Sequence, residues 1–143
     1  MESIIETGTA AFNFVYGGRA KFTLVSKKTS KRFTYEIRAA KKTSETRKPI
    51  MFVRVLDGPC NQSDYRYIGF INPNAVGLQA GKKGLPTADS FRALNWAIDK
   101  FAADTMPDEL ELWHSGHCGA CGRELTVPSS IASGLGPVCA KKH

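Results

Sequence analysis

Three cysteines near the C-terminal end of the chain stand at a spacing that could hold a metal ion. Cys118 and Cys121 have two residues between them, a gap that lets two thiolates bind one tetrahedral Zn²⁺ from a tight turn. Gly122 follows where such a turn usually needs a positive φ. Cys139 is the natural third ligand, because Gly136-Pro137 before it resembles a helix start whose positive end would favour a thiolate. We therefore predict a zinc knuckle.

The fourth ligand has three candidates, all of them histidines. His117 adjoins Cys118 and would have to fold back sharply, and His143 stands at the end of the sequence, where chains fray. His114 lies four residues before Cys118, at the end of a plausible strand, so the spacing favours His114. Four protein ligands leave no open position on the metal, which predicts a structural rather than a catalytic site.

Residues 113–143 hold few large apolar side chains and cannot bury a sizeable core. Metal binding worth roughly 10–16 kcal/mol in comparable modules would decide whether this segment folds. A redox role for Cys118 and Cys121 is a weaker interpretation, because no βαβ pattern precedes them, and a disulfide is disfavoured in a reducing compartment. Cys60 stands alone and is not counted as a site residue.

Alternation of apolar and polar side chains predicts a small antiparallel sheet over residues 20–71. The stretch 26–31 is polar and reads as a hairpin loop, and residues 74–87 are rich in Gly and Lys and read as a loop. The four predicted strands are Ala20–Val25, Arg32–Arg38, Met51–Leu56 and Tyr65–Ile71.

A helix is expected to begin near Ala88 and to end before Pro107. Its apolar residues recur at three- and four-residue steps and need one face of the sheet as a partner: Phe91, Leu94, Ile98 and Phe101. The predicted fold is therefore α+β, with a basic domain over residues 1–112 and a zinc-binding module over residues 113–143.

The positive charge of the chain lies in its first third. The formal net charge is +7, and residues 1–49 carry eleven Lys and Arg against four Glu, whereas the remainder balances nine basic and nine acidic side chains. Such asymmetry favours a polyanionic or acidic partner, although a solvated face that aids solubility is the alternative interpretation. The predicted phosphate-binding residues lie on the first two strands and their hairpin: Lys21, Lys27, Lys28, Lys31, Arg32 and Arg38.

Aromatic side chains near these cations could stack on bases, as they do in single-strand binders. The candidates are Tyr16, Tyr65, Tyr67 and Phe70. Aromatic residues at alternating positions more often belong to a core, so this assignment is the weaker part of the hypothesis.

The N-terminal residues lack the basic start and long apolar stretch of a secretory signal. No run approaches the roughly 18 apolar residues that span a bilayer. We therefore expect a cytoplasmic protein with no membrane partner.

The C-terminal run resembles an uncharacterised domain family of phages, plasmids and bacteria, with the pattern H-x-G-x-C-x-x-C-G-R-x-L-T-x-P-x-S-I-x-x-G-x-G-P-x-C. The chain matches each fixed position from His114 to Cys139. The first half is similar as well, at Arg32–Tyr35, Gly58-Pro59, Asp64-Tyr65 and Tyr67–Gly69, whereas Cys60 departs from the polar or acidic residue of relatives. The resemblance implies zinc binding, supports His114 as the fourth ligand, and implies a mobile-element origin in a bacterial host cell.

No catalytic motif is recognisable in the sequence. A zinc deaminase would need a His-x-Glu element and an open metal position, and no G-x-S-x-G elbow, P-loop or Rossmann fingerprint is present. We expect a non-enzymatic, zinc-containing phage or mobile-element protein that binds nucleic acid or a nucleoprotein through its basic N-terminal sheet. The alternative is a protein-binding inhibitor of a host defence system, of anti-CRISPR or anti-restriction type.

Overall fold

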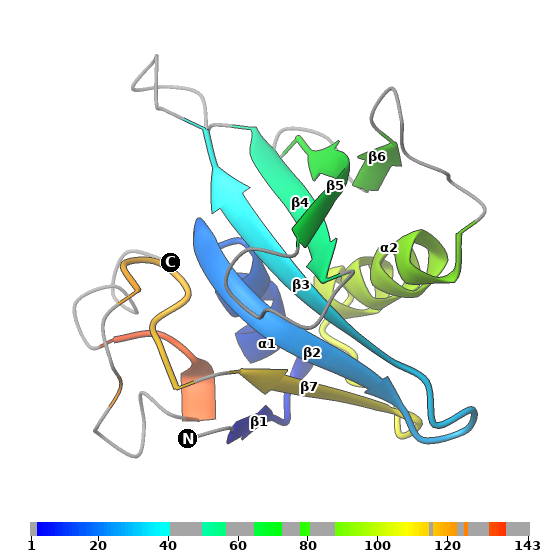
Figure 1. Ribbon diagram of the computed structural model, residues 1–143. Coiled ribbons are helices and arrows are strands. Elements are labelled where there is room, and N and C mark those ends of the chain that lie inside the picture. The colour runs from blue at the N-terminus through cyan, green and yellow to red at the C-terminus, as the bar shows by residue number, and fades with distance from the viewer. Residues whose placement is uncertain are drawn as a thin grey trace.

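The computed structural model describes residues 3–40, 50–56, 65–72, 78–80, 88–114, 116–122, 125 and 132–136. These residues form a seven-stranded antiparallel sheet and two helices, which is the predicted α+β class (Figure 1). The strand order across the sheet is β1-β7-β2-β3-β4-β5-β6. In chain order the elements are β1 (Ser3–Ile5), α1 (Gly8–Val15), β2 (Arg19–Ser26), β3 (Arg32–Ala39), β4 (Met51–Leu56), β5 (Tyr65–Ile71), β6 (Leu78–Ala80), α2 (Asp89–Ala102) and β7 (Leu110–His114).

The four strands predicted from alternation are confirmed as β2, β3, β4 and β5. In β2, Ala20, Phe22 and Leu24 are buried and the residues between them are not, and Phe22 lies opposite Tyr35 of β3. The predicted hairpin loop between β2 and β3 is also confirmed. The N–H of Ser26 donates to the carbonyl oxygen of Lys31 at 2.9 Å, which closes the loop at the base of its turn.

The predicted helix is confirmed as α2. Its apolar stripe is buried, as expected, at Phe91, Leu94, Ile98 and Phe101. The hydroxyl of Tyr35 in β3 donates to the carbonyl oxygen of Ser90 at 2.6 Å and ties the start of α2 to the sheet. Residues 103–109 then separate α2 from β7, and Pro107 lies in this connection.

Three elements were not predicted from the sequence: β1, α1 and β6. The prediction of a loop over residues 74–87 is wrong at residues 78–80, which form β6 against β5. Helix α1 was missed, although Thr7 caps it by accepting the N–H of Ala10 at 3.2 Å. Strand β7 lies between β1 and β2, so the predicted boundary between residues 112 and 113 falls within a strand of the main sheet.

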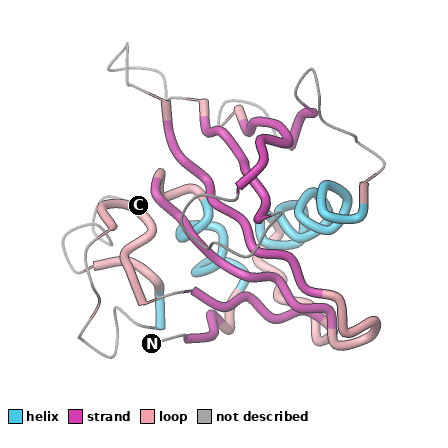
Figure 2. The backbone as a smooth tube through the Cα atoms, viewed as in Figure 1, coloured by secondary structure: helices cyan, strands magenta, loops and turns pink. Residues whose placement is uncertain are grey.

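The hydrophobic core lies between the sheet and the two helices. Both helices cover the same face of the sheet (Figures 1 and 2), and their buried side chains join those of the strands in one cluster. Its largest fully buried members include Tyr35, Phe14, Phe22, Phe101, Leu94 and Leu112. The opposite face of β2, β3, β4 and β5 carries no helix among the described residues, and we call it the open face.

No helix in the described part of the chain is long and apolar enough to cross a membrane.

Candidate nucleic-acid interface and metal centre

The segment after β7 forms a tight turn around the sulfur of Cys118. The N–H of Gly122 donates to the carbonyl oxygen of Cys118 at 2.9 Å, and Gly122 has the positive φ, +78°, that the sequence predicts. The Cys118 side chain is buried, and its Sγ accepts N–H groups from Ala120 at 3.4 Å and from Gly136 at 3.2 Å. Backbone donors aimed at a buried sulfur stabilise a thiolate.

The pKa of Cys118 reflects two opposing effects. Burial raises the pKa of the thiol, but the N–H groups of Gly136, Cys121 and Ala120 and the thiol of Cys121 lower it, to about 7. A substantial fraction of Cys118 is therefore a thiolate at neutral pH, which is the form that binds zinc. Cys121 contributes to this balance, so the two sulfurs are neighbours.

His114, the last residue of β7, is fully buried against the helix side of the sheet. Its ring lies 5.6 Å from that of Phe14, and its Nδ1 accepts the N–H of Gly116 at 3.0 Å. An accepting Nδ1 places the proton of a neutral imidazole on Nε2. Coordination through Nε2 would require the other tautomer, and coordination through Nδ1 would replace the Gly116 bond. The structure thus gives His114 a packing role beside its predicted ligand role.

The full ligand set extends beyond the described residues. Cys139 and His143 lie outside them, as does Cys60. Within the described ranges, no three His, Cys, Asp or Glu side chains gather closely enough to hold a metal ion. The structure brings Cys118 and Cys121 together, but His114, which is also described, does not gather with them into a three-ligand cluster, so the four-ligand zinc site stays a prediction.

The cysteine turn packs directly on the start of β2. The N–H of Arg19 donates to the carbonyl oxygen of Gly119 at 2.6 Å, and a Cβ added to Gly17 would lie 2.6 Å from that same oxygen. The guanidinium of Arg19 also reaches the carbonyl oxygen of Cys121, with Nη1 donating at 3.5 Å. The position of Arg19 on the sheet therefore depends on the cysteine turn.

Cations and aromatic rings share cross-strand rows on the open face. One row, set by the strand register, consists of Arg19 (β2), Arg38 (β3), Phe52 (β4) and Phe70 (β5). The next row consists of Lys21, Glu36, Arg54 and Tyr67 on the same four strands. Directly opposed residues of an antiparallel sheet project from the same face, so each row presents basic side chains at one end and rings at the other.

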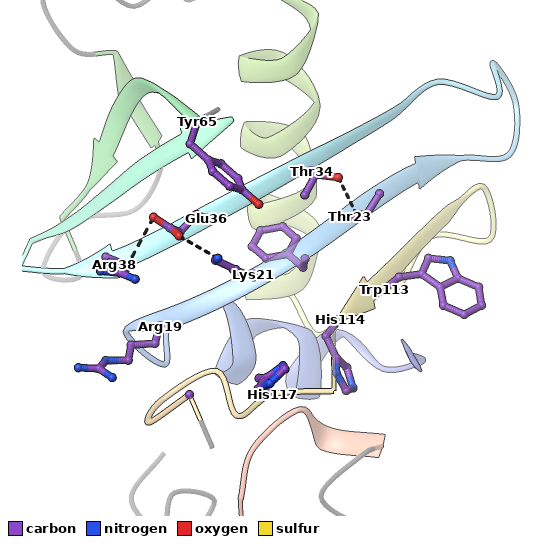
Figure 3. Close-up of a pocket in the computed structure, with 12 residues that line it drawn as sticks. Arg19, Lys21, Thr23, Thr34, Glu36, Arg38, Tyr65, Trp113, His114 and His117 are labelled. Carbon is purple, nitrogen blue, oxygen red and sulfur yellow. Dashed lines mark hydrogen bonds and ion pairs between the residues drawn. The ribbon is translucent and has the colours of Figure 1, made fainter. Parts of the chain in front are cut away.

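A hollow of about 530 Å³ lies over β2 and β3 on this face (Figure 3). Arg19 and Arg38 line one end, and Tyr65 leans over the strands toward Lys21, whose Nζ lies 5.5 Å from the centre of the Tyr65 ring. Among the described lining residues Glu36 is the only carboxylate, while Trp113 and His117 complete the far side. The hollow is therefore a mainly basic depression bordered by aromatic rings.

The six predicted phosphate-binding cations divide between two places. Lys21, Arg32 and Arg38 lie on the open face, where Lys21 and Arg38 share Glu36 at 3.5 Å and 3.7 Å. Lys31 instead pairs with Asp89 of α2 at 2.9 Å. Lys28 and Lys31 line a second hollow beside α2, and Lys27 is exposed in the hairpin. The structure thus brings Lys21 and Arg38 together at Glu36, whereas Arg32, at the start of β3, does not line the hollow and the hairpin lysines lie elsewhere.

The aromatic candidates also divide. Tyr67 is 38% exposed on the open face and meets Phe52, 42% exposed, edge to face at 6.1 Å. Tyr65 borders the hollow, and burial followed by the charge of Glu36 raises its pKa, so its phenol stays neutral. Tyr16 follows α1 and stacks on Phe12, at 4.2 Å between ring centres, and both pack against the core on the helix side. Tyr16 is therefore not part of the open face.

Sequence reasoning missed four residues of this face: Arg19, Arg54, Phe52 and Trp113. Phe52 and Arg54 alternate with the buried Met51, Val53 and Val55, so the alternation of β4 contained the signal. Arg19 and Trp113 required the register of β2 with β3 and β7, which only the fold provides.

Comparison with known proteins places one part of this chain. Residues 113–143 match the model of a family of unknown function, DUF6011. No curated protein and no solved structure matches the chain. The family match thus supports the resemblance seen in the sequence for the C-terminal segment. It assigns no function to that segment.

Proposed function

We propose that this protein binds nucleic acid on the open face of its sheet and that its function is binding rather than catalysis. The observation that carries the proposal is the pair of cross-strand rows on the open face, with Arg19, Arg38 and Lys21 next to exposed aromatic rings. Cations bind phosphates without reading sequence, and exposed rings stack on bases of any kind. The combination fits a weakly sequence-selective binder.

The balance of charge around the hollow supports this proposal. Its described lining holds three cations, Arg19, Lys21 and Arg38, and one carboxylate, Glu36. Glu36 is 7% exposed and its side chain lies between two of the cations, so it orients them while leaving the hollow with a net positive charge. A polyanion gains from such a surface through release of its counterions.

The proposal includes a structural zinc ion in the C-terminal segment, held by Cys118, Cys121, Cys139 and His114. The chemistry of the donor set fits zinc, because the Cys118 sulfur is buried, accepts backbone N–H groups and has a second thiol beside it. The described apolar core of this segment is a cluster of three residues, Cys118, Leu125 and Leu135, which is too small to stabilise a fold alone. A bound zinc ion would supply the missing folding free energy.

The cellular setting belongs to the same proposal. The signature from His114 to Cys139 supports a phage or mobile-element protein acting in the cytoplasm of a bacterial cell. The alternative function, inhibition of a host defence protein, would use the same open face for a protein partner.

Titration of fluorescent single- and double-stranded DNA and of RNA at several salt concentrations tests the proposal. Affinity is expected to fall linearly on a log–log plot against salt, with a slope near −0.7 per phosphate contact on single strands and near −0.9 on duplexes. Absence of binding to every probe at low salt would overturn it. A pull-down from nuclease-treated host lysate separates the alternative, because an inhibitor would retain a stoichiometric protein partner.

A further inference from the structure

The row that begins with Arg19 combines two chemistries in adjacent positions. Arg19 lies directly opposite Arg38, and Arg38 lies directly opposite Phe52. Neighbouring strands are about 4.8 Å apart, so the two guanidinium groups and the ring follow one another across the sheet. Figure 3 shows Arg19 and Arg38 at the same end of the hollow.

Opposed arginines are unfavourable in the free protein. Like charges directly opposite each other destabilise an antiparallel pair. Glu36 compensates Lys21 and Arg38, but within the described residues Arg19 makes no ion pair, and its guanidinium donates only to the carbonyl oxygen of Cys121 at 3.5 Å. The missing component of this pair is an anion that both arginines can bind.

Phe52 offers the complementary apolar surface one strand away. It is among the most exposed large apolar side chains of the described residues, at 42%, and it is braced by the ring of Tyr67. A ring held by an edge contact keeps its orientation and presents its remaining surface to solvent. Such a ring is a platform for a base that is not already stacked in a duplex.

We propose that Arg19, Arg38 and Phe52 form a subsite for one nucleotide of a single-stranded nucleic acid, with the phosphate between the two arginines and the base on Phe52. This inference rests on the proposed function and gives it a substrate class. Guanidinium groups bind phosphate oxygens in bidentate fashion, and two of them on one phosphate remove the repulsion between Arg19 and Arg38. The cysteine turn positions the subsite, because it fixes Arg19 through Gly119 and Cys121.

Arginine substitutions test the phosphate half, with a short fluorescent oligothymidylate as the probe. Arg19→Gln and Arg38→Gln are each expected to weaken binding roughly tenfold, and the double variant should reduce the salt slope by about 0.7, because the two arginines share one phosphate. The double variant should lose less affinity than the product of the two single-variant factors, because both guanidinium groups bind one phosphate. Arg32→Gln is the matched control, since Arg32 is exposed on the same face of β3 but lies opposite Val25.

A second readout separates this subsite from a structural role. Arg19→Gln should raise the melting temperature of the free protein, because it removes the repulsion with Arg38, whereas Arg32→Gln should leave it unchanged. Excess inorganic phosphate should compete only weakly with the oligonucleotide for binding to the wild type. Complete competition by phosphate would mean that the site binds phosphate alone and does not contact the base.

Phe52→Leu tests the base half with two probes, the oligothymidylate and the same chain with abasic sugars. The variant should bind the oligothymidylate at least fivefold more weakly and the abasic probe as the wild type does, because only a base can stack. The subsite is wrong, and the proposed function stands, if the wild type binds single strands but Arg19→Gln and Arg38→Gln lose no more affinity than Arg32→Gln. The same conclusion follows if Phe52→Leu weakens the binding of both probes equally. If wild type binds no strand at all, both fail together.

Discussion

Replacing Glu36 with glutamine should change stability and nucleic-acid affinity in opposite directions. Glu36 lies 3.5 Å from Lys21 Nζ and 3.7 Å from Arg38 Nε. An unscreened pair at this separation would be worth several kcal/mol, but the Lys21 and Arg38 side chains are 38% and 67% exposed, so solvent reduces each pair to about 0.5 kcal/mol. Losing both pairs should cost about 1 kcal/mol of unfolding free energy and lower the melting temperature by about 3 °C.

The same substitution removes the one described carboxylate from the lining of the basic hollow. Phosphate would no longer compete with Glu36 for Lys21 and Arg38, so affinity for single-stranded DNA should rise about tenfold, the value of one additional charge-assisted contact. The slope of log affinity against log salt should steepen by up to about 0.7 for each cation released.

Glu111→Gln is the matched control for this prediction. Glu111 lies on the same face of the sheet, opposite Val25, and does not line the hollow. Its substitution changes the net charge by the same amount but should alter affinity by less than about twofold. Anisotropy titrations and thermal melts of the two variants, side by side, decide the matter. An equal gain from both would reduce the effect to net charge, and no gain from Glu36→Gln would refute the reasoning about the hollow.

Three further predictions concern the cysteine turn and its support of β2. Cys118→Ser should abolish stoichiometric zinc binding, measured by elemental analysis, and should expose the chain after β7 to limited proteolysis; intact metal content would contradict the assigned ligand. Because hydrogen bonds lower the pKa of Cys118 to about 7 in the folded protein, zinc affinity should fall as the pH drops below about 7, where protons compete with the metal for the thiolate; a zinc affinity independent of pH would oppose this. Gly17→Ala should push the turn off β2, because the new Cβ would lie 2.6 Å from the carbonyl oxygen of Gly119. The variant should lose about 1–3 kcal/mol of unfolding free energy and should bind DNA several-fold more weakly. An unchanged melting temperature would show that the turn can move freely.

The sequence predicts those parts of the fold that repeat. The alternation in β2 to β5 and the stripe of α2 are each long enough to define one buried face, and the structure confirms them. Helix α1, Gly8–Val15, spans only about two turns and carries apolar side chains at half-buried as well as buried positions, so its sequence shows no clear stripe. β6 spans only Leu78–Ala80, too few residues to show a period.

The candidate site divides in the same way. Cys118 and Cys121 follow from local spacing, because a tight turn brings residues three apart together. Arg19, Arg38 and Phe52 lie far apart along the chain, and only the pairing of β2, β3 and β4 makes them neighbours. The partners of the hairpin cations could not be foreseen either, since Lys31 meets Asp89 through tertiary packing.

Ultraviolet cross-linking of the protein to single-stranded DNA, followed by mass spectrometry of the linked peptides, would show which face of the sheet binds nucleic acid. Aromatic side chains on both faces serve as reporters: Phe52, Tyr67 and Trp113 on or beside the open face, and Trp96, 38% exposed on α2, on the other. Cross-links confined to the first three are predicted. Cross-links at Trp96 with none on the open face would place nucleic acid on the helix side and rule out binding at the open face.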